Sequence, residues 1–162
     1  MLSSIFRSRK TLSENGIIEK IMSQAGYQTI FAIATPPGRS AIAVIRISGP
    51  TAGDAPTLFG ATCPVAGQFS VARLVLDQRV IDQAILLFMK APHSSTGEDV
   101  CEIHCHGSRA VIDVLLARLG ASDGFRMAQA GEFTRRGFMN GKMDLSGVEG
   151  LADLIEAETS TQ

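Results

Sequence analysis

The stretch Val100-Cys101-Glu102-Ile103-His104-Cys105-His106 decides the fold, because side chains of two kinds alternate along it. Successive side chains of a β-strand point to opposite faces of its sheet, so this alternation predicts a half-buried strand. One face carries the small or apolar side chains Cys101, Ile103 and Cys105. The other face carries Val100 and the polar side chains Glu102, His104 and His106. We expect the cysteines to be buried as small hydrophobes and the polar face to line a pocket.

A metal site is the alternative for this stretch, because it contains every side-chain type that zinc prefers. Alternation separates the cysteines from the histidines, so the two kinds cannot share one ion. Glu102, His104 and His106 could still supply three ligands, but no second cluster in the sequence completes or orients such a site. We predict that the chain holds no metal.

Other short β-branched runs, bounded by glycine and proline, predict four further strands around this one. The expected strands cover residues 30–34, 41–47, 71–76, 81–89 and 100–106. Residues 108–119 predict a helix with one apolar face, capped by Ser108 and ended by Gly120. The segment after Pro50 is expected to be mostly loop, because Gly53 and Pro56 leave little room for a helix. The pattern is typical of an α+β, or mixed α/β, fold without regular strand–helix alternation.

The two ends of the chain are expected to differ from the domain between them. We expect either that Met22 is the true start or that residues 1–27 are a flexible extension. Residues 28–143 form the expected domain. In residues 144–162, Ser146 and Glu149 fit a capping box and open an amphipathic helix, which we expect to be the first helix of a helical domain.

Composition excludes several classes of protein. The 162 residues are 45% hydrophobic, enough for one compact core, and the net charge of -1 lacks the basic excess of a dedicated nucleic-acid binder. Three cysteines, an odd number, do not make a secreted disulfide framework. No apolar run approaches the roughly 20 residues of a membrane span. We expect a cytoplasmic protein.

A near-match to a nucleotide-binding loop lies at Gly137-Phe138-Met139-Asn140-Gly141-Lys142-Met143. A P-loop needs four residues between its glycines and a Ser or Thr after the lysine to hold magnesium. This segment has three residues between the glycines, and Met143 follows the lysine. The chain is therefore not expected to hydrolyse a nucleoside triphosphate by a P-loop mechanism.

Charged side chains at unusual positions point to a ligand instead. Arg46 interrupts an apolar strand on the parity of its apolar neighbours, so it must either reach solvent or find an anion. The segment 131–144 gathers Glu132, Arg135, Arg136 and Lys142, which are either solvated or part of a site. Together with Glu102, these cations and the carboxylate suit a pterin with a glutamate tail.

Six motifs in order support a resemblance to a known family. They are Thr35-Pro36-Pro37-Gly38-Arg39, Ile45-Arg46-Ile47-Ser48-Gly49, Thr96-Gly97-Glu98-Asp99-Val100, His104-Cys105-His106-Gly107, Gly131-Glu132-Phe133-Thr134 and Asn140-Gly141-Lys142. Over residues 28–158 the chain resembles the N-terminal domain of the tRNA modification GTPases MnmE, also called TrmE. The resemblance implies a tetrahydrofolate-binding domain, similar in fold to the folate domain of the glycine-cleavage aminomethyltransferases, that also forms a homodimer. It implies that Arg46, Glu102 and Lys142 bind 5-formyl- or 5,10-methylene-tetrahydrofolate, with no catalytic residue in this chain.

The resemblance also implies partners. The complete proteins of this family work with the flavoprotein MnmG (GidA) to add an aminomethyl-type group at carbon 5 of the tRNA wobble uridine. The resemblance implies that GTP, magnesium and potassium bind in a G domain, which we expect to lie outside this sequence. Some residues depart from the family pattern: Ser40-Ala41-Ile42-Ala43 replaces a glycine-richer stretch, Ser108 a second glycine and Ala130 a proline. Ala41 and Ala43 are expected to add methyl groups near the site.

Three alternatives remain open. A free-standing folate-dependent one-carbon transferase would use His104 or His106 as acid or base. A metalloprotein would use Glu102, His104 and His106. A purely structural dimer module would retain a folate pocket that is no longer used.

Overall fold

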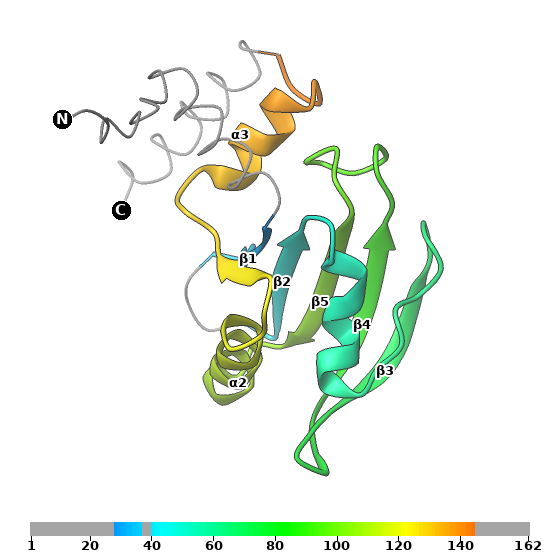
Figure 1. The fold of residues 1–162 in the computed structure, drawn as a ribbon. Coiled ribbons are helices and arrows are strands. Elements are labelled where there is room, and N and C mark those ends of the chain that lie inside the picture. The colour runs from blue at the N-terminus through cyan, green and yellow to red at the C-terminus, as the bar shows by residue number, and fades with distance from the viewer. Residues whose placement is uncertain (1–27, 37–39, 145–162) are drawn as a thin grey trace, which may run out of the picture.

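The computed structural model describes residues 28–36 and 40–144 and is built around one β-sheet (Figure 1). In chain order its elements are β1 (Thr29–Ile33), β2 (Ile42–Ser48), the 3-10 helix η1 (Ala52–Phe59), β3 (Phe69–Leu76), β4 (Arg79–Met89), β5 (Val100–His106), α2 (Arg109–Gly120), β6 (Phe125–Met127) and α3 (Glu132–Met139). The five expected strands and the expected helix are confirmed, each to within two residues.

The sheet is mixed, with the strand order β3-β4-β5-β2-β1-β6. Neighbouring strands run antiparallel except for β1 and β6, which are parallel. This arrangement confirms the expected mixed α/β class. Strand β5, whose side chains alternate between polar and apolar, lies between β4 and β2 and is paired along both edges.

One face of the sheet is covered by α2 and η1, and the hydrophobic core lies beneath them (Figure 1). Leu115 and Leu119 of α2 are fully buried, which confirms the apolar face expected for this helix. The sheet contributes the side chains on the facing parity, including Ile45, Ile47 and Ile103. Cys101 and Cys105 also belong to this core, as the alternation along β5 predicts.

The segment after Pro50 corrects the sequence prediction, because it forms the eight-residue η1 and not a loop. Ala52, Ala55 and Phe59 are each 0% exposed, so burial against the sheet stabilises a helix that the local sequence disfavours. The chain then turns at Gly60, whose φ of 66° lies in the left-handed region that glycine adopts at little cost.

The expected caps of α2 are also only partly right. Ser108 occupies the N-cap position, but its side chain makes no capping hydrogen bond. Gly120 is the last residue of the helix and the C-cap is Ala121 in a right-handed conformation, so glycine does not end this helix by a left-handed turn.

Besides η1, two described elements were not predicted, namely β6 and α3. Strand β6 has only three residues, too few for an alternating pattern to be read. Helix α3 is amphipathic but short and highly charged. The expected extension over residues 1–27 and, apart from Asp144, the expected helix within residues 144–162 lie outside the described residues. Among the described residues, no helix is long and apolar enough to cross a membrane.

Candidate functional site

Arg46 and Glu102 are direct neighbours on adjacent strands, although 56 residues separate them in sequence. The register pairs Arg46 of β2 with Glu102 of β5, and Val44 with His104. These residues alternate with Ile45, Ile47 and Ile103 of the core, so their side chains lie on the sheet face opposite α2 and η1. The polar face predicted from the alternation in β5 is thus confirmed.

The Glu102 carboxylate is held by two donors. Arg46 Nε lies 2.8 Å from Oε1, and His104 Nε2 lies 2.9 Å from Oε2. The Glu102 side chain is only 10% exposed. Burial alone would raise the pKa of Glu102, but the hydrogen bonds from His104 and Arg46 outweigh it and lower the pKa. Glu102 is therefore an ionised, oriented acceptor at neutral pH.

Arg46 is only partly used by this pair. Its side chain is 35% exposed, and the hydrogen bond to Glu102 involves Nε alone. The two terminal nitrogens of the guanidinium remain available to an anionic group, for which the planar fork is well suited. Glu102 also keeps unused lone pairs on both oxygens, since each carboxylate oxygen can accept two hydrogen bonds.

Lys142 follows α3 in the chain and packs against Gly97, in the turn that leads into β5. A Cβ added at Gly97 would lie 3.2 Å from Cγ and 3.4 Å from Cδ of Lys142, so the lysine stem passes over this glycine. Lys142 itself is exposed. The side chain therefore has a fixed root and a solvent-accessible ammonium group.

The loop beneath Lys142 lies on the same sheet face as Arg46. Ser48 is two residues beyond Arg46 in β2, and its hydroxyl lies 2.7 Å from the Thr96 hydroxyl and 2.7 Å from Glu98 Oε2. Since Ser48 shares the parity of Arg46, residues 96–98 cover the end of that face. The structure thus pairs Arg46 with Glu102 directly, and Lys142 is linked to that pair only through the loop of residues 96–98.

Glu132 and Arg136 occupy a buried ionic network and not the ligand-binding surface suggested for their segment. Arg136 is 5% exposed and donates to Glu98, to Glu132 and to the carbonyl of Gln28. Glu132 is 2% exposed and also accepts from Arg126 at 2.7 Å. The network fastens α3 to β6 and to the loop before β5. Arg135, in contrast, is largely exposed.

A shallow cavity of about 270 Å³ lies beside His104, on the sheet face that carries Arg46 and Glu102. His104 and His106 contribute polar atoms to its wall, and Ile42, Val71 and Ile85 contribute apolar surface. His106 does not join Glu102. Its Nδ1 lies 2.7 Å from Asp82, whose pKa is lowered because hydrogen bonds from His106 outweigh the effect of burial.

The three side chains considered as metal ligands have different partners. Glu102 is engaged by Arg46 and His104, while His106 pairs with Asp82. Among residues 28–36 and 40–144, no group of three or more His, Cys, Asp or Glu side chains could hold a metal ion.

The two cysteines of β5 are buried in the core. Burial raises the pKa of Cys105 to about 11 and raises the pKa of Cys101 further, so both thiols stay protonated.

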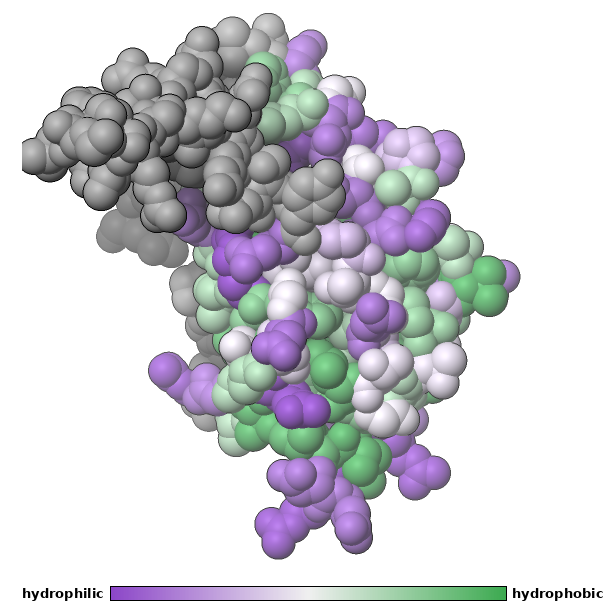
Figure 2. All heavy atoms as spheres, viewed as in Figure 1, coloured by the Kyte–Doolittle hydropathy of each residue, from purple (hydrophilic) through white to green (hydrophobic). Residues whose placement is uncertain are grey.

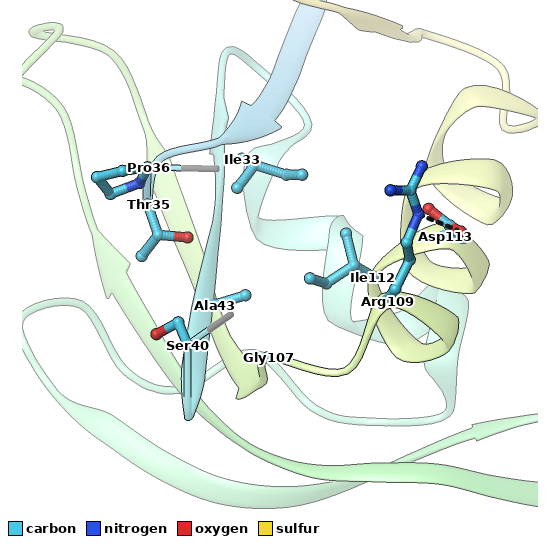
Figure 3. A pocket seen from close by; sticks show the side chains of 9 residues that line it. All are labelled: Ile33, Thr35, Pro36, Ser40, Ala43, Gly107, Arg109, Ile112 and Asp113. Carbon is cyan, nitrogen blue, oxygen red and sulfur yellow. Dashed lines mark ion pairs between the residues drawn. The ribbon is translucent and has the colours of Figure 1, made fainter. Parts of the chain in front are cut away.

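A second cavity, of about 260 Å³, opens on the helix side between β1, β2 and α2 (Figure 3). Ile33, Ala43 and Ile112 supply its apolar wall, and Arg109 pairs loosely with Asp113 at its edge, at 3.7 Å. Ala43 is 3% exposed and faces the core, so its methyl group does not approach Arg46 as expected from the sequence. The two cavities lie on opposite faces of the sheet.

Comparison with known proteins places the chain in a family. Residues 29–142 match the sequence model of a family described as "GTP-binding protein TrmE N-terminus". The chain belongs to this family. The match spans β1 through Lys142, so it includes the whole described sheet and all three site residues.

Curated relatives of this TrmE N-terminal domain carry the name "tRNA modification GTPase MnmE". The protein of Roseobacter denitrificans is 51% identical over 135 residues, which cover 83% of this chain and 32% of that protein. The proteins of Rhodopseudomonas palustris (strain BisB5) and Caulobacter vibrioides are 50% and 49% identical, each over 83% of this chain and 30% of their own length. The chain thus spans about a third of the length of the curated relatives it matches.

Proposed function

We propose that residues 28–143 form a tetrahydrofolate-binding and dimerisation domain, whose ligand is 5-formyl- or 5,10-methylene-tetrahydrofolate. The observation that carries the proposal is the Arg46–Glu102 pair on the open sheet face, together with Lys142, which packs on the loop that leads into β5. Two cations and one ionised carboxylate match the charges of a folate, whose glutamate tail is anionic and whose pterin edge donates paired hydrogen bonds. The proposal includes a fold similar to the folate domain of the glycine-cleavage aminomethyltransferases.

Each group has a distinct part in this binding. The Glu102 carboxylate, oriented by His104, accepts hydrogen bonds from the pterin edge. The terminal nitrogens of Arg46 and the ammonium of Lys142 attract the anionic parts of the ligand. The apolar wall of the neighbouring cavity, including Ile42 and Ile85, offers surface to the ring faces.

The same sheet face supports the proposed homodimer. Four large apolar side chains stand exposed on it, by 42% to 71%: Ile42, Phe69, Val71 and Ile85. Phe69 and Val71 lie on β3, where the register places Val71 opposite Ile85 of β4, whereas Ile42 lies on β2, beyond β5. On the side covered by α2 and η1, hydrophobic residues form an area in the lower middle of the view, with hydrophilic residues around it (Figure 2). Large apolar side chains exposed on a sheet are typical of a surface that a partner covers. A second copy that covers Phe69 and Val71 on β3 would leave Ile42 and Ile85 to the ligand.

In the larger setting, we propose that the domain serves a tRNA-modifying GTPase. The curated relatives bear that name, and the chain matches about a third of their length. The folate would supply the one-carbon unit for an aminomethyl-type group at carbon 5 of the wobble uridine, in work shared with MnmG (GidA). GTP, magnesium and potassium would act in the G domain of such a protein, and tRNA would be bound by the assembly.

Calorimetric titration of the chain with 5-formyl-tetrahydrofolate tests the folate proposal. We expect saturable binding that weakens at least tenfold in Arg46→Ala, since a charged hydrogen-bond donor is lost. Arg79→Ala is the matched control, because Arg79 is an exposed strand arginine on β4 outside the site. Binding that is absent, or equally affected by both substitutions, would contradict the proposal.

A second candidate is a free-standing one-carbon transferase, which the His106–Asp82 pair favours. A carboxylate at 2.7 Å from Nδ1 orients the imidazole and leaves Nε2 as a proton carrier beside the cavity. Turnover of 5,10-methylene-tetrahydrofolate by the isolated chain, without GTP or a partner, and its loss in His106→Gln would support this candidate. The binding-module proposal expects no such turnover.

A further inference from the structure

The loop formed by residues 94–99 connects the three proposed folate ligands. It leads directly into β5, so Glu102 follows it by three residues. It bonds to Ser48, two residues from Arg46, through both Thr96 and Glu98. It also carries Gly97, over which the Lys142 stem passes.

A hydrogen bond ties the segment of Lys142 to this loop. The side-chain amide of Asn140, the C-cap residue of α3, donates to the main-chain carbonyl of Thr96 at 2.7 Å. Residues 140 and 142 both pack closely against Gly97 of the loop. A Cβ at Gly97 would lie 2.7 Å from Cβ of Asn140, nearer than two carbon atoms normally approach. Gly97 has a φ of 75°, a conformation that also favours glycine.

The hydrogen bond of Asn140 is not needed to hold α3 in place. Arg136 already fastens the helix to the loop through Glu98, and to β1 through the carbonyl of Gln28. Gly137 packs on the loop as well, since a Cβ there would lie 2.8 Å from the carbonyl oxygen of Ser95. Asn140 and Lys142, by contrast, are exposed at the end of the helix. Main-chain amides of Asn140 and Lys142 donate to the carbonyls of Arg136 and Gly137, so residues 140–142 are closed onto the helix end. The side chain of Asn140 docks that helix end on the loop.

We infer that Asn140 and Gly97 are positioning residues, which set where the Lys142 ammonium stands relative to the Arg46–Glu102 pair. Gly97 leaves the space through which the lysine stem passes, and the side chain of Asn140 docks the helix end that carries residues 140–142 on the loop. Neither residue needs to touch the folate. The inference rests on the proposed folate function, because Lys142 is the proposed ligand that the two residues orient.

A double-mutant cycle with 5-formyl-tetrahydrofolate separates positioning from direct contact. We expect Asn140→Ala to weaken binding about fivefold, because the binding step must then also order the segment that carries Lys142. In a chain that already carries Lys142→Ala, the same substitution should change the affinity by less than twofold, because there is no longer a lysine to orient. Urea denaturation should show that Asn140→Ala is folded, with the same small decrease in midpoint with and without Lys142.

Gly97→Ala provides a second variant that acts on the same segment by crowding. It should weaken binding at least as much as Asn140→Ala, and this loss should also vanish in the Lys142→Ala background. Circular dichroism and a urea midpoint show whether the variant is folded when it is titrated. If it is unfolded, the Asn140 cycle alone decides.

The possible outcomes distinguish this inference from the folate proposal. If the parent chain does not bind, or Lys142→Ala binds as the parent does, the folate role of Lys142 is wrong. If Lys142→Ala weakens binding but Asn140→Ala does not, the folate role stands and the positioning inference is overturned. It is also overturned if Asn140→Ala weakens binding equally with and without Lys142, since that pattern indicates direct contact or a general structural effect.

Discussion

Protonation of Glu132 is predicted to destabilise the domain at acidic pH by an amount that can be worked out from the structure. Hydrogen bonds from Arg126, followed by those from the Gln129 main chain and Arg136, lower the pKa of Glu132 to about 2 from 4.5. A lowered pKa means that the stabilisation is fully present above pH 4.5 and is lost as the pH falls toward 2. The difference of about 2.5 units corresponds to about 3 kcal/mol, of which about 2 kcal/mol is lost by pH 3.

Glu132→Gln isolates this contribution from those of the other carboxyl groups. The amide keeps the shape of the side chain but removes its charge, so two guanidinium groups lose their shared anion. At pH 7 we expect the variant to be destabilised by about 3 kcal/mol or more, as for other broken buried ion pairs. At pH 3 the difference between variant and parent should shrink by about 2 kcal/mol.

Urea denaturation followed by circular dichroism at pH 7 and pH 3 measures both free energies of unfolding. Because parent and variant share all other titrating groups, the change in their difference reports Glu132 alone. Arg135→Ala is the control, since Arg135 lies 3.9 Å from the same carboxylate but is largely exposed, and it should cost less than about 1 kcal/mol. A parent–variant difference that is the same at both pH values would refute the assigned network.

Three further predictions concern packing, assembly and thiol chemistry. Gly107→Ala should destabilise the chain by about 2 kcal/mol or more in urea denaturation, because its Cβ would lie 1.9 Å from the carbonyl oxygen of Ser40. Gly120→Ala, which meets only ordinary contacts at the end of α2, should be neutral or stabilising. Val71→Glu on the open sheet face should shift sedimentation from dimer to monomer, whereas Val114→Glu on α2 should not. The two thiols of β5 should react with a disulfide reagent only after unfolding, because burial keeps them protonated and inaccessible.

The sequence predicted β5 and its two faces well, because alternation is a local property. Cys101 and Cys105 are buried with Ile103, and Glu102 is turned to the opposite face, as the period of two requires. The pairing of Glu102 with Arg46 is different in kind. It depends on the register between β2 and β5, which no local pattern determines for strands so far apart in the chain.

Helix α3 shows why another part of the site could not be predicted. Its segment is rich in charge and begins with a glycine, so neither apolar periodicity nor a capping side chain marks it strongly. Its stability comes from partners elsewhere in the chain, such as Arg126 on β6 and Glu98 before β5. Lys142 was singled out from the sequence, but its place beside Gly97 follows from this packing.

The most direct test of the central claim is to map where folate binds on the chain. In a nuclear magnetic resonance titration of the isotope-labelled chain with 5-formyl-tetrahydrofolate, we predict the largest shifts at the main-chain amides of Arg46, Glu102, His104 and Lys142. Amides beside the helix-side cavity of Figure 3, such as those of Ile112 and Asp113, should stay unchanged. Shifts confined to that cavity, or no shifts at saturating folate, would contradict the assignment of the open sheet face as the folate site.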